Sequence, residues 1–158
     1  MRCFVLLTKQ QNMMQLIFGT QNDWVGFILR VALGGIMFPH GAQKLFGWFG
    51  GYGITATMEF FTKSMKLPWT LSMIVILIES VGSIALILGF GSRVWALGLL
   101  AIMMGAIFTT NIENGFFMNW FGNQSGEGYE YHLLVIIICV VIILTGSGKY
   151  SVDGLIQK

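Results

Sequence analysis

Three ionisable side chains, Arg30, His40 and Lys44, interrupt an apolar stretch of the chain over residues 24–46. The stretch is long enough to cross a bilayer, which requires about 20 mostly apolar residues in a helix. A charge at membrane depth costs about 2.5–3.5 kcal/mol on insertion scales, so such residues normally face a bundle interior or a wet cavity. At about 100° per residue, the three side chains share one face of a helix. That face is therefore predicted to turn inward, toward partners from the rest of the chain.

Four more ionisable side chains lie within or at the ends of other apolar stretches: Glu79, Glu113, Glu130 and His132. Charged residues in membrane spans usually mark ligand or proton paths. Histidine, whose unperturbed pKa is about 6.5, is the natural proton relay. We therefore predict a polar pocket in the outer half of a helix bundle, with these candidate binding or proton-relay residues: Arg30, His40, Lys44, Glu79, Glu113, Glu130 and His132.

Each of these residues also has a purely structural interpretation. Arg30 is displaced by about 7 Å from the middle of its helix, so its long side chain could reach Glu79. A buried Arg30–Glu79 pair could serve only to fix the register of two helices. The two histidines could be hydrogen-bonded at the membrane interface, and the glutamates at helix ends could simply be solvated. The sequence favours the Arg30–Glu79 pair and leaves its role open.

The composition places the chain among membrane proteins. Of its 158 residues, 55% are hydrophobic and 10% are charged, whereas about 25% of the residues of a soluble domain are charged. The net charge of +2 is too small for a nucleic-acid surface. Cys3 and Cys139 are far apart and form neither a metal-ligand nor a thiol redox motif, so no metal site is expected.

The hydrophobic pattern predicts an all-α fold, a polytopic membrane four-helix bundle. Its spans are expected over residues 24–46, 69–90, 94–112 and 129–145. Residues 54–67 are too short to span, and their periodicity predicts an amphipathic helix on the membrane surface between the first and second spans. Small residues predict close helix contacts, at Gly34 and Gly41 in the first span and along a stripe of Gly98, Gly105 and Thr109 in the third.

Basic residues predict the orientation of this bundle. Four spans place both termini on one side, where five Lys and Arg residues would gather against three on the other side. The excess favours cytoplasmic termini. Residues 1–22 lack an apolar run long enough for a signal peptide and are expected to form a cytoplasmic tail. Residues 23–148 then form the membrane domain, and residues 149–158 form a short, solvated cytoplasmic tail.

Four segments resemble the DoxX family of small four-helix membrane proteins. They are RVALGGIMFPHGAQKLFG in the first span, ILIESVGSIALILGFGSR in and after the second, GYEYHLLVIIICV at the start of the fourth, and the closing GSGKYSVDGLI. Together they extend the resemblance over about residues 23–155. The positions that match the family pattern are Arg30, His40, Gly41, Lys44, Glu79, Glu130 and His132.

The resemblance implies a connection with redox chemistry in a bacterial inner membrane. The family is named after a subunit of a membrane thiosulfate:quinone oxidoreductase, and other members are linked to redox-stress complexes or to quinone and catechol resistance. The expected function is therefore that of a subunit or accessory of a membrane redox system, with a quinone as the candidate ligand. Whether the protein is itself an enzyme is left open.

Two other classes of function fit the same residues. Buried charges also mark the path of a solute through a transporter or channel, and a purely structural partner subunit would need only the bundle. A haem b held by His40 and His132 is geometrically conceivable but is not the expected cofactor. The expected partners are the lipid bilayer and a membrane or redox protein or a second copy of the chain, and no nucleic acid.

Overall fold

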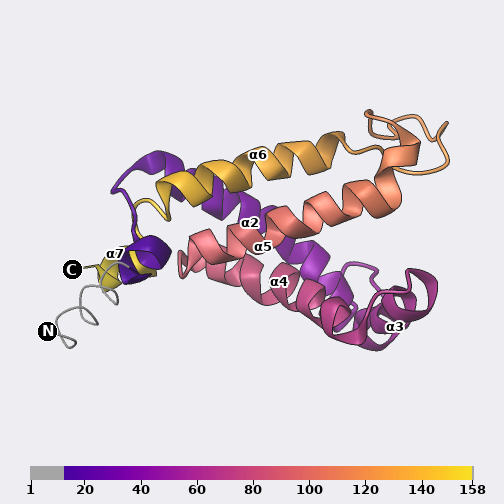
Figure 1. Cartoon of the computed structure of the whole chain (residues 1–158), viewed down its shortest axis with the longest axis horizontal. Helices are drawn as coiled ribbons and strands as arrows, with labels where there is room; N and C mark the ends of the chain where they lie inside the picture. The colour runs from indigo at the N-terminus through magenta and orange to yellow at the C-terminus, as the bar shows by residue number, and fades with distance from the viewer. Residues whose placement is uncertain (1–12, 158) are drawn as a thin grey trace, which may run out of the picture.

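The computed structural model describes residues 13–157, and within these residues the chain is helical without any strand (Figure 1). A short helix at 13–18 comes first. The elements that follow are α2 (Trp24–Phe46), α3 (Gly53–Glu59), the π-helix η1 (Phe60–Ser64), α4 (Trp69–Leu88), α5 (Ser92–Ala106), the π-helix η2 (Ile107–Asn111), the 3-10 helix η3 (Ile112–Asn114), α6 (Glu130–Thr145) and α7 (Val152–Ile156). The all-helical fold is as predicted. Most of the predicted tail 1–22 lies outside the described residues.

Three helices of the described chain are long and apolar enough to cross a membrane. They are Trp24–Phe46, Trp69–Leu88 and Ser92–Asn114, and they agree closely with the first three predicted spans. The helix Glu130–Thr145 is also apolar, but it has only 16 residues. At 1.5 Å per residue it measures about 24 Å, less than the hydrocarbon thickness of about 30 Å. The fourth span therefore stays a prediction.

Close packing of α2 on α4 depends on two glycines. A methyl group added at Gly34 would lie 2.6 Å from the carbonyl oxygen of Ser83, and one added at Gly41 would lie 2.4 Å from that of Glu79. Glycine lets two helix backbones approach this closely because it carries no side chain. The predicted role of Gly34 and Gly41 is thus confirmed, and their contact fixes α2 alongside α4.

The predicted ion pair between Arg30 and Glu79 is wrong. The buried guanidinium of Arg30 instead donates to five backbone carbonyls. Two of them, Leu86 (3.0 Å) and Ile87, belong to the last turn of α4. The other three follow α6, at Ser147 (2.7 Å), Lys149 (3.0 Å) and Tyr150 (2.7 Å). The carbonyl end of a helix attracts cations, so Arg30 binds α4 at its end and not at its middle.

The C-terminal segment packs into the bundle, so the prediction of a solvated tail from residue 149 is also wrong. Asp153 is 1% exposed and accepts hydrogen bonds from the backbone N–H groups of Gly91 (2.7 Å) and Ser92 (3.2 Å). The hydroxyl of Ser147 also donates to it. Ser151 caps α7 by accepting from the N–H of Gly154. These contacts join the end of the chain to the turn between α4 and α5.

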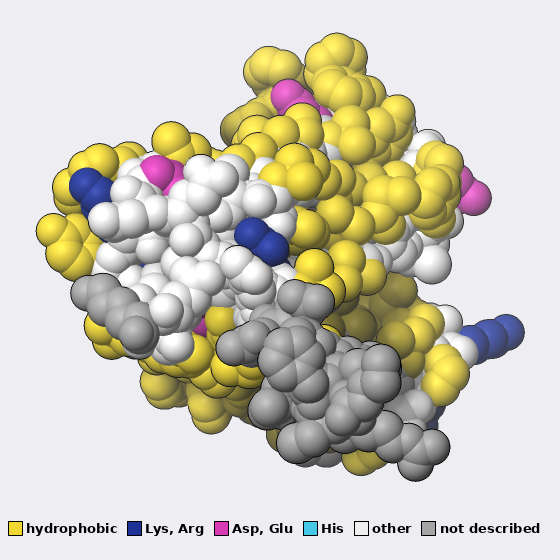
Figure 2. All heavy atoms as spheres, turned by 60° about the vertical axis from the view of Figure 1, so that its left-hand side comes forward, with side chains coloured by type: hydrophobic (Ala, Val, Ile, Leu, Met, Phe, Trp, Pro, Cys, Tyr) yellow, Lys and Arg dark blue, Asp and Glu magenta, His cyan; other side chains and the backbone are white. Residues whose placement is uncertain are grey.

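Both ends of the described chain lie at the same end of the bundle (Figure 1). The N–H of Gly148 donates to the hydroxyl of Thr20 (2.7 Å), and the N–H of Lys149 donates to the carbonyl of Asp23 (2.9 Å). Figure 2 looks toward this end and shows a polar patch bordered by hydrophobic side chains. Such a border is expected where a membrane protein leaves the hydrocarbon.

Candidate functional site

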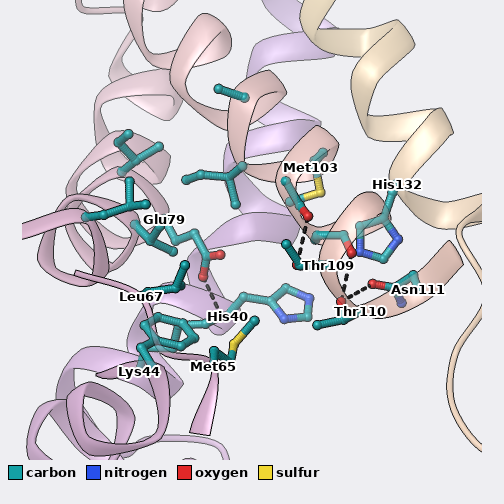
Figure 3. A pocket seen from close by; sticks show the side chains of 18 of the residues that line it. His40, Lys44, Met65, Leu67, Glu79, Met103, Thr109, Thr110, Asn111 and His132 are labelled. Carbon is teal, nitrogen blue, oxygen red and sulfur yellow. Dashed lines mark hydrogen bonds and ion pairs between the residues drawn. The ribbon is translucent and has the colours of Figure 1, made fainter. Parts of the chain in front are cut away.

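A cavity of about 660 Å³ lies between α2, α4, α5 and α6, near the end of the bundle that carries α3 (Figure 3). Its wall is mostly apolar and includes side chains of Met, Ile, Leu, Val and Phe. The polar residues on the wall are His40, Lys44, Glu79, Thr109, Thr110, Asn111, Glu127, Tyr131 and His132. Helices α2, α4, η2 and α6 and the loop before α6 thus contribute polar groups to one largely apolar space.

Lys44 and Glu79 form an ion pair across α2 and α4. The Glu79 side chain is 7% exposed and that of Lys44 is 25% exposed. Gly41, one turn before Lys44, lies against the backbone of Glu79 and allows the short distance between the helices. Apart from the ammonium of Lys44, no described group offers a hydrogen bond to the buried Oε2 atom of Glu79. The carboxylate therefore depends on Lys44 for its stabilisation, as a charge at this depth requires.

His40 extends into the cavity beside this ion pair (Figure 3). Its ring lies 6.4 Å from that of Tyr131, measured between centroids. The Tyr131 hydroxyl donates to the sulfur of Met37 at 3.6 Å. Tyr131 therefore connects α6 to α2 across the wall of the cavity.

The opposite wall comes from the end of α5, from η2 and from α6. Thr109 and Thr110 both bond back to carbonyls of their own helix, at Gly105 and Ala106 respectively (2.8 Å each). On α6, the buried Nδ1 atom of His132 has no hydrogen-bond partner among the described residues. His132 therefore retains an unused hydrogen-bonding nitrogen, and a polar ligand could satisfy it.

Both π-helices of the described chain contribute to this cavity, through Phe60 and Phe61 of η1 and through Thr109, Thr110 and Asn111 of η2. In π-helical turns each backbone bond spans one more residue than in an α-helix, and such turns are frequent at functional sites. The side chain of Asn111 donates to the carbonyl of Glu127 (2.8 Å), which ties η2 to the following loop.

Four of the seven candidate residues line the cavity: His40, Lys44, Glu79 and His132. Arg30 lies at the other end of the bundle, in the carbonyl cluster described above. Glu113 is exposed on η3 and does not line the cavity. Glu130 lies just outside, where its Oε2 atom accepts from the N–H of Met118 (3.3 Å). A proton-relay role for the four lining residues stays a prediction.

Sequence reasoning missed several polar members of the wall. Tyr131 lies between two of the candidate residues, Glu130 and His132, so its position in the sequence could have indicated it. Thr109 was assigned to a close-packing stripe, whereas it lines the cavity. Asn111 and Glu127 carried no such signal, because the loop that joins them is placed only by tertiary contacts.

Within the described part of the chain, no three His, Cys, Asp or Glu side chains are grouped so that they could hold a metal ion. Cys139 is buried as a free thiol in the hydrophobic core, and Cys3 lies outside the described residues.

Residues 25–112 match the sequence model of the DoxX family. A protein of Bacillus subtilis (strain 168) named "Putative oxidoreductase CatD" is 28% identical over 131 residues, which cover 83% of this chain and 86% of that protein. An uncharacterized protein of Haemophilus influenzae (strain ATCC 51907 / DSM 11121 / KW20 / Rd) is 27% identical over 133 residues, 83% of this chain and 82% of that protein. No solved structure matches the chain.

Proposed function

The chain belongs to the DoxX family of membrane proteins, and on this premise we propose that it is a subunit or accessory of a membrane redox system. In this proposal a small quinone-like molecule binds in the cavity beside Lys44 and Glu79. The membrane is the inner membrane of a bacterium. The name of the Bacillus subtilis relative, "Putative oxidoreductase CatD", supports the redox assignment.

The observation that carries this proposal is the composition of the cavity wall. Sites for small organic molecules typically measure about 300–1,000 Å³ and combine apolar walls with a few polar groups that orient the ligand. The cavity of about 660 Å³ has this character. Its polar groups come from opposite walls, with Lys44 and His40 on α2 and His132 on α6.

A quinone ring fits such a wall because it is flat and apolar, with carbonyl oxygens at opposite edges. The ammonium of Lys44 and an imidazole N–H of His40, which line the same wall, can donate to one oxygen. An imidazole N–H of His132 can donate to the other, since its Nδ1 atom has no partner among the described groups. Reduction of the ring to a quinol adds two electrons and two protons. In a subunit or accessory role the electrons come from a partner redox protein, and His40 and His132 are suited to carry the protons.

Direct binding tests this proposal. The purified protein in lipid nanodiscs should bind 2,3-dimethoxy-5-methyl-1,4-benzoquinone saturably in equilibrium dialysis. His40→Leu should weaken binding about tenfold, which corresponds to about 1.4 kcal/mol. His40 makes no hydrogen bond with a described residue, so its replacement should leave folding intact.

Glu59→Gln is the matched control, because Glu59 is exposed on α3 and does not line the cavity. It should bind the probe as the unmodified protein does. Absence of saturable binding, or equal binding by the His40→Leu variant, would contradict the proposal. Uptake of the probe into sealed proteoliposomes would instead favour the transport alternative.

A further inference from the structure

The cavity opens sideways between α4 and α5. Near the turn that joins these helices they are in close contact, since a methyl group added at Gly82 would lie 2.7 Å from the ring of Trp95. Further along, one added at Gly98 would lie 2.9 Å from Ile78. At Gly105 an added methyl group would meet no atom within 4 Å. The helices thus diverge from their turn, as Figure 1 also shows.

This divergence corrects the prediction that Gly105 and Thr109 belong to a close-packing stripe with Gly98. Gly98 does pack on Ile78, whereas Gly105 and Thr109 line the open end of the cavity. A glycine in a helix costs about 1 kcal/mol relative to alanine. At Gly105 no backbone of another described helix lies close enough to require a glycine.

The mouth of the cavity is apolar and exposed. On α4 it is bordered by Leu71 (44% exposed) and Ile74 (50% exposed), and on α5 by Ala101 and Gly105, which are also exposed. Both helices are long and apolar enough to cross a membrane. In a bilayer Ile74, Ala101 and Gly105, which lie inside these spans, would therefore border hydrocarbon.

The mouth and the interior of the cavity differ in polarity. The mouth is bordered mostly by hydrocarbon side chains, and the hydroxyl of Thr109 there bonds back to its own helix. The Lys44–Glu79 pair lies deeper, with the Glu79 side chain 7% exposed. A ligand that matches both must have a polar head and an apolar tail. A small polar solute would have to pass lipid to enter here. A pure hydrocarbon would leave the buried Nδ1 atom of His132, which has no hydrogen-bond partner among the described residues, unsatisfied.

We infer that the gap between α4 and α5 is an entrance from the lipid, and that it holds the alkyl or isoprenoid tail of a ligand whose head reaches Lys44 and Glu79. The inference rests on the proposed function and extends it to a substrate class, the membrane-dissolved quinones that carry a tail. Each methylene of the tail in an apolar groove contributes to binding through burial.

The test uses two probes with one head group, 2,3-dimethoxy-5-methyl-1,4-benzoquinone alone and the same ring with a ten-carbon alkyl chain. Gly105→Phe introduces a bulky ring at the mouth, at a position where an added Cβ meets no atom of the described chain within 4 Å. Gly35→Phe is the matched control. Gly35 also lies in a membrane-span helix with no atom within 4 Å of an added Cβ, but it does not line the cavity.

Gly105→Phe should weaken binding of the tailed probe at least tenfold and that of the tailless probe less than threefold, and Gly35→Phe should change neither. Ala101→Phe, one turn earlier at the same mouth, should repeat this result and replaces Gly105→Phe if that variant does not fold. Equal effects on both probes, or no effect, would overturn the entrance while leaving the proposed function standing. Failure of the unmodified protein to bind either probe would overturn both.

Discussion

Lys44 and Glu79 are charged side chains within apolar helices, where charge is disfavoured. Each neutralises the charge of the other in an ion pair. Removing one member of a fully buried pair costs about 3–5 kcal/mol, because the other charge is left unpaired. Lys44 retains 25% of its side-chain exposure, so the lower end of that range is expected. The pair therefore has a stabilising role whether or not it binds a ligand.

A double-mutant cycle separates the two roles of this pair. Glu79→Gln and Lys44→Gln should each lower the free energy of unfolding by about 3 kcal/mol. The double variant should recover much of that loss, because no uncompensated charge remains. If the pair also binds the quinone head, the double variant should be folded and bind the probe at least tenfold more weakly. Unchanged binding by a stable double variant would reduce the pair to a structural contact.

The matched control for this cycle is the ion pair of Glu59 and Lys63, which are four residues apart on α3 and η1 and exposed. The hydrogen bond and the charge of Lys63 lower the pKa of Glu59. Solvent screens such a pair, so removing either member should leave stability almost unchanged. A loss as large as that at Lys44–Glu79 would show that burial is not what makes the cavity pair important.

Arg30 should be intolerant even of lysine. Its five N–H groups all donate to carbonyls, whereas lysine offers three. Hydrogen bonds to charged groups contribute about 1.5–3 kcal/mol each, so Arg30→Lys should destabilise the protein by about 3 kcal/mol or more in thermal or denaturant unfolding. Arg93→Lys is the control, since Arg93 is only half-buried and donates to two carbonyls. Equal stability of the two variants would contradict this account.

The residues around the cavity were partly predictable because charge is rare in this chain. A His, Lys or Glu within an apolar stretch is expected to face the bundle interior, and this reasoning led to His40, Lys44 and Glu79, which line the cavity. Their role as a binding site or proton relay stays a prediction. The partners of Arg30 could not be found in the same way. A helical wheel gives the direction of a side chain but neither its depth nor its partner, and backbone carbonyls carry no sequence signal.

At the scale of the helices, the α2–α4 contact depends on Gly41. Gly41→Val should push α4 away from α2, because an added Cβ would lie 2.4 Å from the carbonyl oxygen of Glu79. The Lys44–Glu79 pair should then separate, and thermal stability should fall. Gly35→Val carries the same β-branched side chain in the same helix, but an added Cβ at this position meets no atom of the described chain within 4 Å. Similar unfolding temperatures for the two variants would show that stability does not depend on the close α2–α4 contact at Gly41.

The helix formed by α3 and η1 is placed by prediction on the outer membrane surface, over residues 54–67. Phe61 is buried against the bundle, whereas Lys63 and Lys66 are exposed. Cysteines at Lys63 and Lys66 should therefore react with an impermeant thiol reagent added outside cells, and a cysteine at Phe61 should not. The native cysteines are replaced beforehand. Equal labelling of all three positions would contradict an amphipathic surface helix.

The helices themselves were predictable and their irregular parts were not. Hydrophobic length alone placed α2, α4 and α5. The π-helical turns η1 and η2 involve single-residue changes in backbone bonding, which the hydrophobic period does not resolve. Helix α7 has five residues, too few to be stable alone. It depends on the bonds of Asp153 to Gly91 and Ser92, so its burial follows from tertiary contacts.

Over the whole molecule, the two ends of the bundle differ in structure: one is held by buried polar contacts and the other contains the cavity. At the end of the bundle where both ends of the described chain lie, Arg30 binds backbone carbonyls and the carboxylate of Asp153 is buried. The other half of the bundle contains the cavity, bordered by α3, η1 and the loop before α6. The helices are therefore joined by hydrogen bonds at one end of the bundle, and the cavity lies in the other half.

This arrangement gives the orientation of the protein a direct test. Because Gly148 and Lys149 are bonded to Thr20 and Asp23, we expect the two segments to lie on the same side of the membrane. The basic residues, five on the terminal side and three on the other, predict that this side is the cytoplasm. A fluorescent protein fused after Lys158 should fluoresce in the cytoplasm, whereas alkaline phosphatase fused there should be inactive. Phosphatase inserted after Gln124, in the exposed loop at the opposite end, should be active. The reverse pattern would place the termini outside, and activity at both positions would mean that the helix Glu130–Thr145 does not span.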